Sequence, residues 1–402
     1  MKFIEGGVCA AQGFTASGIH CGIRKNRDKR DLALIVSQKR AAAAVYTQNL
    51  VKGAPLLVTK ANIADGCASA ILCNSGNANT CNADGEEVAQ KMCALAADAL
   101  GISARDVVVA STGVIGQRLD ISPIAAGMEA LVSGLSTDAL PAAEAILTTD
   151  TKVKSVAVEF SLGGKTARLG GIAKGSGMIH PNMATMLVFV TTDAAISPQM
   201  LQKALSADVQ TSFNRISVDG DTSTNDMCCV LANGMAGNAE IAADGEDYAA
   251  FCAALNAVTT ALCRMIARDG EGATKLVECT LTGAKTQAAA DAVSKAVICS
   301  SLVKAAMFGS DANWGRVLCA IGYAGADVDV NKVDVYFRSA AGRVSVCKSG
   351  AGVDFSEDEA KKVLLEDEVT IEVDLNDGNF SSVAWGCDLT YDYVKINGDY
   401  RT

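Results

Sequence analysis

The interpretation of this chain begins with one stretch, Lys174-Gly175-Ser176-Gly177-Met178-Ile179-His180-Pro181-Asn182-Met183-Ala184-Thr185-Met186-Leu187-Val188-Phe189-Val190. A glycine-rich polar loop leads into a small residue, a threonine and an unbroken apolar run. Such a run is typical of a β-strand buried on both faces. We interpret the stretch as a self-cleavage site between Ala184 and Thr185, because a cut there would place a hydroxyl and a free α-amine on one residue.

An N-terminal threonine can serve as both nucleophile and base. Its α-amino group has a pKa of about 7.7–8.0, so a useful fraction is neutral near pH 7–8. Cleavage would proceed by attack of the Thr185 hydroxyl on the Ala184 carbonyl, giving an ester that water opens. The chain has only two histidines, His20 and His180. This scarcity favours the amine as base, although His180 lies beside the site and leaves an imidazole base open.

Composition limits the classes of function. The chain has 402 residues, is 50% hydrophobic and carries a formal net charge of −10. The negative charge argues against a nucleic-acid partner, and no segment resembles a membrane span or a signal peptide. The sequence therefore predicts a cytoplasmic protein with no membrane partner. Its 15 cysteines never form Cys-x-x-Cys and are expected to be small buried hydrophobes. Two histidines cannot build a His-rich metal site, so no metal is predicted.

The first two thirds of the chain alternates short apolar runs with helical patterns. We predict strands at 32–36, 70–73, 106–110 and 186–190 and helices at 86–100 and 248–267. Gly101 is the expected C-cap of the first helix. The pattern changes near residue 276, where one helix at 288–306 precedes strands at 333–337, 343–347, 369–373 and 380–385. Asn376-Asp377-Gly378 is a hairpin-turn signal, and Ser356 is a candidate N-cap. The expected domains are a catalytic domain of residues 1–275 and a smaller C-terminal α+β domain of residues 276–402.

The carbonyl chemistry also needs donors for a developing oxyanion. The stretch Ser111-Thr112-Gly113-Val114-Ile115-Gly116 follows a predicted strand. Gly113 can bring its backbone N–H close to a ligand, and the Thr112 hydroxyl can donate a second hydrogen bond. Both residues are therefore candidates for an oxyanion hole.

Together, these motifs resemble the ornithine acetyltransferase family, the glutamate N-acetyltransferases of arginine biosynthesis. The resemblance spans essentially the whole chain. It is carried by residues 13–18, 73–79, 111–116, 148–151, 174–190, 214–226, 268–275, 309–316 and 393–402. Many separate motifs in one order are far more specific than any single one. The family's common Ala after Ile-Asn is Gly398 in this chain.

The resemblance implies a mixed α/β fold, an αββα sandwich similar to that of the N-terminal-nucleophile hydrolases. It implies an α chain of residues 1–184 and a β chain of residues 185–402, assembled as α2β2. Thr185 matches the acetyl-accepting nucleophile, and Thr112 and Gly113 match the oxyanion hole. The positions that match substrate contacts are Thr148, Lys174, Thr185, Glu271, Asn397 and Thr402, with Thr149 as an alternative to Thr148.

The expected reaction is ping-pong acetyl transfer from N2-acetyl-L-ornithine to L-glutamate through an acetyl-Thr185 ester. Lys174 would hold the α-carboxylate that both substrates share, and Glu271 would pair with the ornithine ammonium. No cofactor is expected, and the use of acetyl-CoA as a further acetyl donor stays open. Two alternatives remain, an amidase or aminopeptidase on the same self-processed scaffold and an unprocessed binding or scaffold protein.

Overall fold

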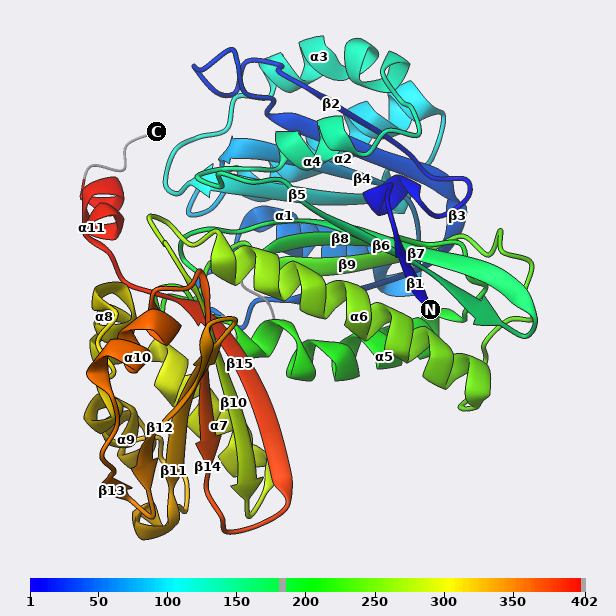
Figure 1. The fold of residues 1–402 in the computed structure, drawn as a ribbon. Helices are drawn as coiled ribbons and strands as arrows, with labels where there is room; N and C mark the ends of the chain where they lie inside the picture. The colour runs from blue at the N-terminus through cyan, green and yellow to red at the C-terminus, as the bar shows by residue number, and fades with distance from the viewer. Residues whose placement is uncertain (181–185, 399–402) are drawn as a thin grey trace.

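The computed structural model describes residues 1–180 and 186–398 (Figure 1). Within these residues, nine strands form one sheet in the order β1-β6-β7-β8-β9-β3-β4-β5, with β2 paired to β3. The strands are β1 (Lys2–Ile4), β2 (Thr15–Ile19), β3 (Leu32–Tyr46), β4 (Cys67–Asn77), β5 (Val107–Val114), β6 (Lys154–Leu162), β7 (Lys165–Lys174), β8 (Leu187–Thr192) and β9 (Met227–Ala232). The 15-residue β3 pairs with β2 and β4 through its first half and with β9 through its second half. It therefore joins two layers of strands.

Helices cover the outer face of each strand layer. Helices α2 (Gly85–Leu100) and α3 (Ser122–Ser133) pack on β3, β4 and β5, while α5 (Pro198–Thr211) and α6 (Glu246–Arg268) pack on β6 to β9. A third apolar cluster lies between the two strand layers. Helices α1 (Ala54–Asn62) and α4 (Leu140–Ala145) contribute to it from the edges. These four layers confirm the predicted αββα sandwich.

Strand β8 explains why the apolar run after Thr185 shows no alternation. Leu187 and Phe189 pack into the cluster between the strand layers, whereas Val188 and Val190 pack against the helices outside. All six residues of β8 are buried. A strand with two covered faces needs apolar side chains at every position, as the sequence predicted.

Helix α6 is the long helix expected at 248–267. Phe251, Leu255 and Leu262 are buried against the sheet. Among the described residues, this one helix is long and apolar enough to cross a membrane by length and composition, and a bent pair formed by α7 and α8 passes the same test jointly. The buried stripe of α6 identifies it as a core helix of the sandwich.

Gly101 has a left-handed φ of 67° and ends α2 as predicted.

A second sheet follows residue 275. In the described part of the chain it has six strands, in the order β13-β12-β11-β14-β10-β15. Its elements are β10 (Leu276–Ala284), α7 (Gln287–Cys299), α8 (Ser301–Gly309), α9 (Trp314–Gly322), β11 (Asp334–Ser339), β12 (Gly342–Lys348), β13 (Ala351–Gly352), α10 (Glu357–Leu364), β14 (Glu368–Asp374), β15 (Phe380–Cys387) and α11 (Tyr391–Asn397). The division of the chain into domains at residues 275 and 276 stays a prediction.

Two predictions in this region are wrong, and one is confirmed. The single helix expected at 288–306 is two helices, because Ser300 leaves the helical conformation and its hydroxyl caps α8 by accepting a hydrogen bond from Val303 N. The hairpin expected at 376–378 does not form, since β14 and β15 both pair with β10, which lies between them. Ser356 caps α10 as expected, accepting a hydrogen bond from Glu359 N.

Candidate active site

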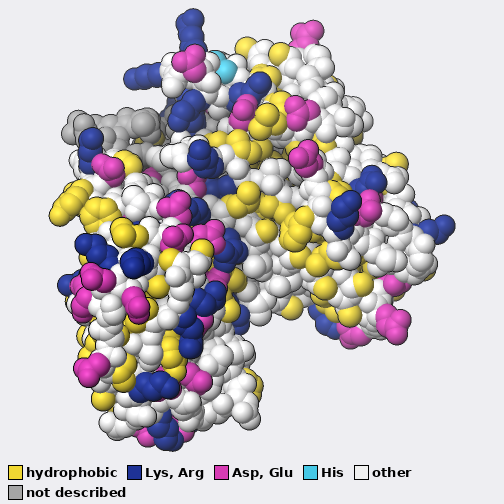
Figure 2. Space-filling view, viewed as in Figure 1, with side chains coloured by type: hydrophobic (Ala, Val, Ile, Leu, Met, Phe, Trp, Pro, Cys, Tyr) yellow, Lys and Arg dark blue, Asp and Glu magenta, His cyan; other side chains and the backbone are white. Residues whose placement is uncertain are grey.

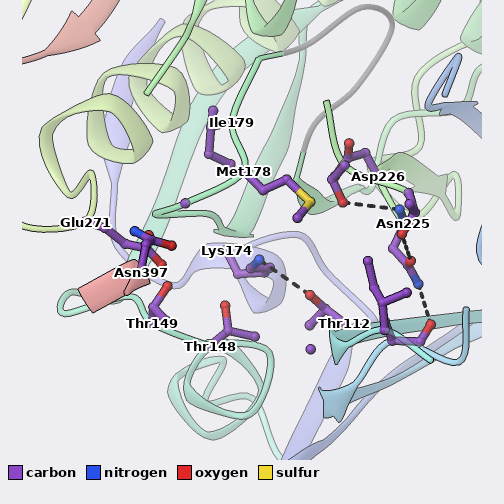
Figure 3. Close-up of a pocket in the computed structure, with 16 residues that line it drawn as sticks. Thr112, Thr148, Thr149, Lys174, Met178, Ile179, Asn225, Asp226, Glu271 and Asn397 are labelled. Carbon is purple, nitrogen blue, oxygen red and sulfur yellow. Dashed lines mark hydrogen bonds between the residues drawn. The ribbon is translucent and has the colours of Figure 1, made fainter. Parts of the chain in front are cut away.

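A polar cleft opens where strands from both layers of the sandwich end (Figure 3). It encloses about 670 Å³, including its open mouth. Its lining residues are Ala78, Thr112, Gly113, Ile115, Thr148, Thr149, Lys174, Gly177, Met178, Ile179, Ser223, Thr224, Asn225, Asp226, Glu271 and Asn397. Six of the residues predicted from the sequence are therefore brought together in one cleft: Thr112, Gly113, Thr148, Lys174, Glu271 and Asn397.

These side chains lie at the ends of strands and in the loops beside them. Thr112 and Gly113 lie near the end of β5, and Lys174 is the last residue of β7. Lys174 is opposite Leu187, the first residue of β8, in the antiparallel register. The described chain thus resumes at this edge of the sheet, and Met186 O accepts a hydrogen bond from Met227 N. Ala184, Thr185 and Thr402 lie outside the described residues.

Thr112 and Gly113 form one wall of the cleft. Gly113 has a φ of +131°, and a Cβ there would lie 2.3 Å from the backbone carbon of Gly76. Only glycine fits this conformation and this close approach. The Thr112 hydroxyl lies 3.4 Å from Lys174 Nζ, which donates a hydrogen bond to it. The wall can therefore present a hydroxyl held in place by a buried ammonium.

Glu271 and Asn397 lie on the opposite side of Lys174 from Asn225 and Asp226 (Figure 3). Asn397 Nδ2 donates a 2.7 Å hydrogen bond to Glu271 Oε2, which links the end of α11 to the loop after α6. Glu271 is buried, and its backbone N–H is bonded to Ser176 O. The cleft thus combines one cation with a carboxylate, an arrangement suited to a ligand that carries both charges. Thr148 and Thr149 both line the cleft.

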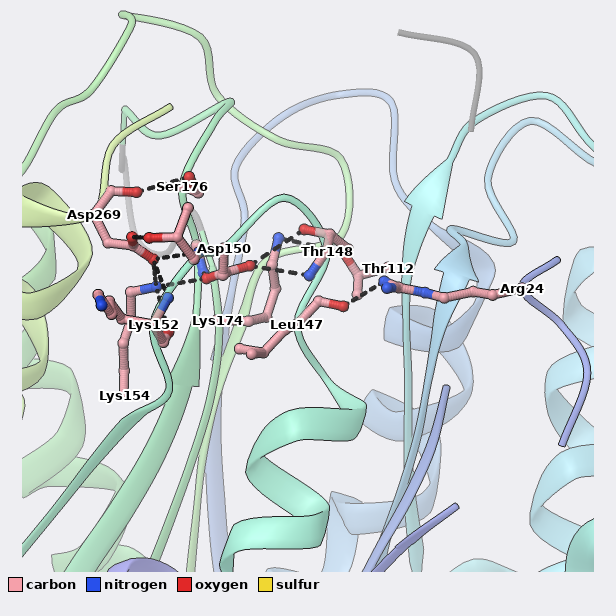
Figure 4. Close-up of polar contacts among 12 residues, drawn as sticks. Arg24, Thr112, Leu147, Thr148, Asp150, Lys152, Lys154, Lys174, Ser176 and Asp269 are labelled. Atoms are coloured by element: carbon pink, nitrogen blue, oxygen red, sulfur yellow. Dashed lines mark hydrogen bonds and ion pairs between the residues drawn. The ribbon is translucent and has the colours of Figure 1, made fainter. Parts of the chain in front are cut away.

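Behind the cleft lies a network of buried charges (Figure 4). Lys154 Nζ donates to Asp150 Oδ1 at 2.7 Å and to Asp269 Oδ2 at 2.6 Å. Asp150 in turn accepts hydrogen bonds from the backbone N–H groups of Thr148 and Gly175, at 3.0 and 2.7 Å. The network therefore holds the two backbone segments that carry Thr148 and Lys174.

Electrostatics set the ionisation state of Asp150. Burial alone would raise the pKa of this carboxyl, but the charges of Lys154 and Lys174, with hydrogen bonds to the carboxylate, lower it to about 2. Asp150 is thus ionised at neutral pH. Sequence analysis noted the motifs around residues 150 and 269 without assigning them this supporting part.

Sequence analysis also missed Asn225 and Asp226. Asn225 Nδ2 donates to Ser111 O at 2.9 Å and to Ala78 O at 2.5 Å, which ties the start of β9 to the other strand layer. Burial raises the pKa of Asp226 well above its usual value, and the nearby charge of Lys174 opposes only part of that rise. Its Oδ2 has no hydrogen-bond partner in the described part of the chain. A buried carboxyl held neutral can donate a hydrogen bond to a ligand.

His180 contacts side chains that do not line the cleft. Its Nδ1 lies 3.1 Å from Ser217 Oγ and 3.6 Å from Cys299 Sγ. Burial, with a contribution from the charge of Lys295, lowers its pKa to about 4. His180 is absent from the described lining of the cleft. Within residues 1–180 and 186–398, no group of three or more His, Cys, Asp or Glu side chains is placed to hold a metal ion.

The fold and the cleft define an α/β sandwich enzyme whose small polar site is built for a charged ligand. Residues 15–402 match the model of the ArgJ family. The chain is 50% identical over 405 residues to the arginine biosynthesis bifunctional protein ArgJ of Caldanaerobacter subterraneus subsp. tengcongensis, and the match covers 100% of both chains. It is 51% identical over 392 residues to arginine biosynthesis bifunctional protein ArgJ 1 of Clostridium acetobutylicum, covering 97% of this chain and 96% of that relative. The chain therefore belongs to the ArgJ family.

A solved structure agrees with this assignment. The crystal structure of arginine biosynthesis bifunctional protein argJ from Bacillus halodurans is 49% identical and has a TM-score of 0.50. The match covers 97% of that chain and 52% of this one. The solved chain is thus about half as long as the chain described above.

Proposed function

We propose that this ArgJ-family enzyme transfers an acetyl group from N2-acetyl-L-ornithine to L-glutamate in arginine biosynthesis, with acetyl-CoA as a second donor. The observation that carries the proposal is the cleft itself, which gathers Thr112, Gly113, Lys174, Glu271 and Asn397 from distant parts of the chain. Relatives that are about half identical along their whole length are bifunctional proteins of arginine biosynthesis. We assign this activity to a cytoplasmic enzyme.

In the proposed mechanism, Thr185 is the N-terminal nucleophile after a cut at the Ala184–Thr185 bond. Its hydroxyl oxygen attacks the acetyl carbonyl, and its α-amine takes the hydroxyl proton. Thr112 and Gly113 stabilise the oxyanion that forms. Ornithine leaves with the proton, and the amine of glutamate then attacks the acetyl ester to give N-acetylglutamate. The half-length chain of the Bacillus halodurans structure supports a cut into two chains of similar size.

The charges of the cleft fit these two substrates. Lys174 would hold the α-carboxylate common to ornithine and glutamate, and Glu271 would pair with the distal ammonium of ornithine. Asn397 orients Glu271 by its 2.7 Å hydrogen bond. Thr148 and Thr402 complete the proposed set of contacts. After cleavage, the two chains would remain together as α2β2.

The test compares Thr185→Ala with Thr166→Ala, an exposed threonine on β7 that serves as the matched control. Thr185→Ala should migrate as one uncut chain on a denaturing gel and form no N-acetylglutamate, whereas the control should be cut and active. A cut and active Thr185→Ala would refute the mechanism. Release of ornithine from N-acetylornithine without formation of N-acetylglutamate would instead identify an amidase.

A further inference from the structure

A second groove adjoins the cleft, and the two share Gly113, Thr148 and Thr149 along their border. The groove is larger, at about 1470 Å³ including its open side. Ornithine and glutamate are small, and the cleft already offers charges for both. The groove therefore has room for a much larger ligand whose end reaches the Thr112–Gly113 wall.

The groove is basic, in contrast to the chain as a whole with its net charge of −10. Its charged lining consists of Arg24, Lys25, Lys29 and Arg118, with Asp120 as the acidic member. Lys and Arg side chains gather over the β2–β3 loop at the top of the molecule (Figure 2). Lys25 and Lys29 are exposed and form no ion pair within the described part of the chain. Arg118 pairs with Asp84 at 2.7 Å.

The basic loop is held firmly against the cleft. Asp31 is fully buried, and its carboxylate accepts hydrogen bonds from the backbone N–H groups of Cys21, Gly22 and Arg24, at 2.6 to 3.2 Å. The Arg24 guanidinium donates to Leu147 O, directly before Thr148 (Figure 4).

Gly76 makes room for this contact. It has a φ of +97°, and a Cβ there would lie 2.8 Å from Arg24 Cγ. The sequence motif at residues 73–79 thus supports the groove.

We propose that this groove binds the phosphorylated nucleotide arm of an acyl-thioester donor, with the thioester end extending past Gly113 into the cleft. Lys25 and Lys29 would contact the phosphates, because exposed ammonium groups without partners are suited to them. Ile23, Leu119 and Pro123 offer apolar surface to the rest of the arm. This inference rests on the proposed function and specifies how its second donor is bound.

The transfer step balances without any further reactant. The Thr185 oxygen forms a bond to the thioester carbonyl carbon, and the carbon–sulfur bond breaks. The thiol leaves with the proton taken from the threonine hydroxyl by the α-amine. The acetyl ester that remains is the same intermediate that N-acetylornithine produces, so one nucleophile serves both donors.

The test is a double charge reversal, Lys25→Glu with Lys29→Glu. The matched control is Lys60→Glu with Lys165→Glu, two exposed lysines outside the groove lining that change the net charge by the same amount. Calorimetry with CoA should show binding to the wild type and binding weaker by about tenfold or more in the groove variant, since a charge-assisted contact is worth a factor on that order. The control should bind within about twofold of the wild type. Formation of N-acetylglutamate from N-acetylornithine should be unchanged in both variants.

S-acetyl-pantetheine provides a second readout, because it keeps the thioester and lacks the nucleotide phosphates. The groove variant should use it as well as the wild type does. Equal binding of CoA by wild type and groove variant, no CoA binding by the wild type, or an equal loss with both thioesters would each overturn the inference. Equal loss of transfer from N-acetylornithine would also overturn it, because the lysines would then support the fold. Absence of transfer from N-acetylornithine in the wild type would refute the proposed function separately, since CoA binding is measured without turnover.

Discussion

Two sets of charges flank the cleft, and they differ in burial and pairing. Behind the cleft, the side chains of Asp150, Lys154 and Asp269 are at most 6% exposed and fully paired. In the adjoining groove, Lys25 and Lys29 are exposed and have no ionic partner in the part of the chain described. A buried, paired charge costs a great deal to disrupt and fixes geometry, whereas an exposed charge contributes little to stability and is available to a ligand. The inner set, Asp150, Lys154 and Asp269, should therefore control the stability of the fold. The outer set, Lys25 and Lys29, should control the affinity for a charged ligand.

The strongest test of this contrast removes the central cation of the inner set. Lys154→Met removes the ammonium group that pairs directly with the buried carboxylates of Asp150 and Asp269, so the free energy of unfolding should fall by about 3–5 kcal/mol. Denaturant unfolding measures the change. Lys152→Met is the control, because that side chain is exposed and its loss should cost less than about 0.5 kcal/mol. A Lys154→Met variant as stable as the control would contradict the assignment of a structural network.

The wall of the cleft lies between the two sets, and its proposed chemistry predicts the next largest effect. Thr112→Val removes the hydroxyl while keeping the shape, so kcat should fall by about 10²–10³-fold, as for loss of one oxyanion donor. Thr112→Ser should recover most of the rate because it restores the hydroxyl. Steady-state kinetics with N-acetylornithine and glutamate provides the measurement. If valine and serine variants were equally active, Thr112 would not be a donor to the oxyanion.

The pH dependence of stability probes the inner set without replacing a cation. The pKa of Asp150 is lowered from 3.8 to about 2 in the folded protein, so its contribution is present above about pH 4 and is lost as the pH falls toward 2. The contribution is on the order of 2 kcal/mol. The free energy of unfolding should decline more steeply between pH 4 and pH 2 for the wild type than for Asp150→Asn. Parallel declines would show that Asp150 is not stabilised as an anion.

Ionic strength should give the smallest effect and affect mainly the outer set. Salt screens exposed charges over about 10 Å at 0.1 M and screens buried ones far less. Raising the salt from 0.05 to 0.5 M should increase the KM for acetyl-CoA about threefold and change the KM for N-acetylornithine less. The double variant of Lys25 and Lys29 should show a flatter response. Equal salt sensitivity for both donors would remove the distinction between the two sets.

Much of the candidate site could be predicted because its residues lie in recognisable motifs. Thr112, Lys174 and Glu271 line one cleft as expected, although their roles stay predictions. Asp150, Lys154 and Asp226 received no role from the sequence, because the behaviour of a carboxyl or ammonium group depends on burial and on partners far along the chain. Asp150 and Asp226 illustrate this, since burial acts on both but only Asp150 also has Lys154 beside it.

The same division holds for the elements of the fold. The apolar runs at 32–36 and 186–190 and the helix at 248–267 follow from periodicity, which is a local property. The break at Ser300 depends on a single side chain capping α8. The pairing of β14 and β15 with β10 joins residues that are between 92 and 111 positions apart, as in Leu276 with Glu368 and Leu276 with Cys387. Local patterns contain no information on which strand inserts between two others.

The sequence alone determined that the apolar run at 186–190 must be covered on both faces, that a threonine precedes this run, and that the chain resembles the ornithine acetyltransferases. These conclusions depend on residue type and order. Only the tertiary structure decided that the end of β7, the end of β5 and the tip of α11 meet in one cleft, and that a basic groove adjoins it. Closure of the four layers around shared apolar cores brings Thr112 and Lys174 into one cleft. Asn397 reaches the same cleft on α11, which follows β15, a strand whose Trp385 and Cys387 pack into one of these cores.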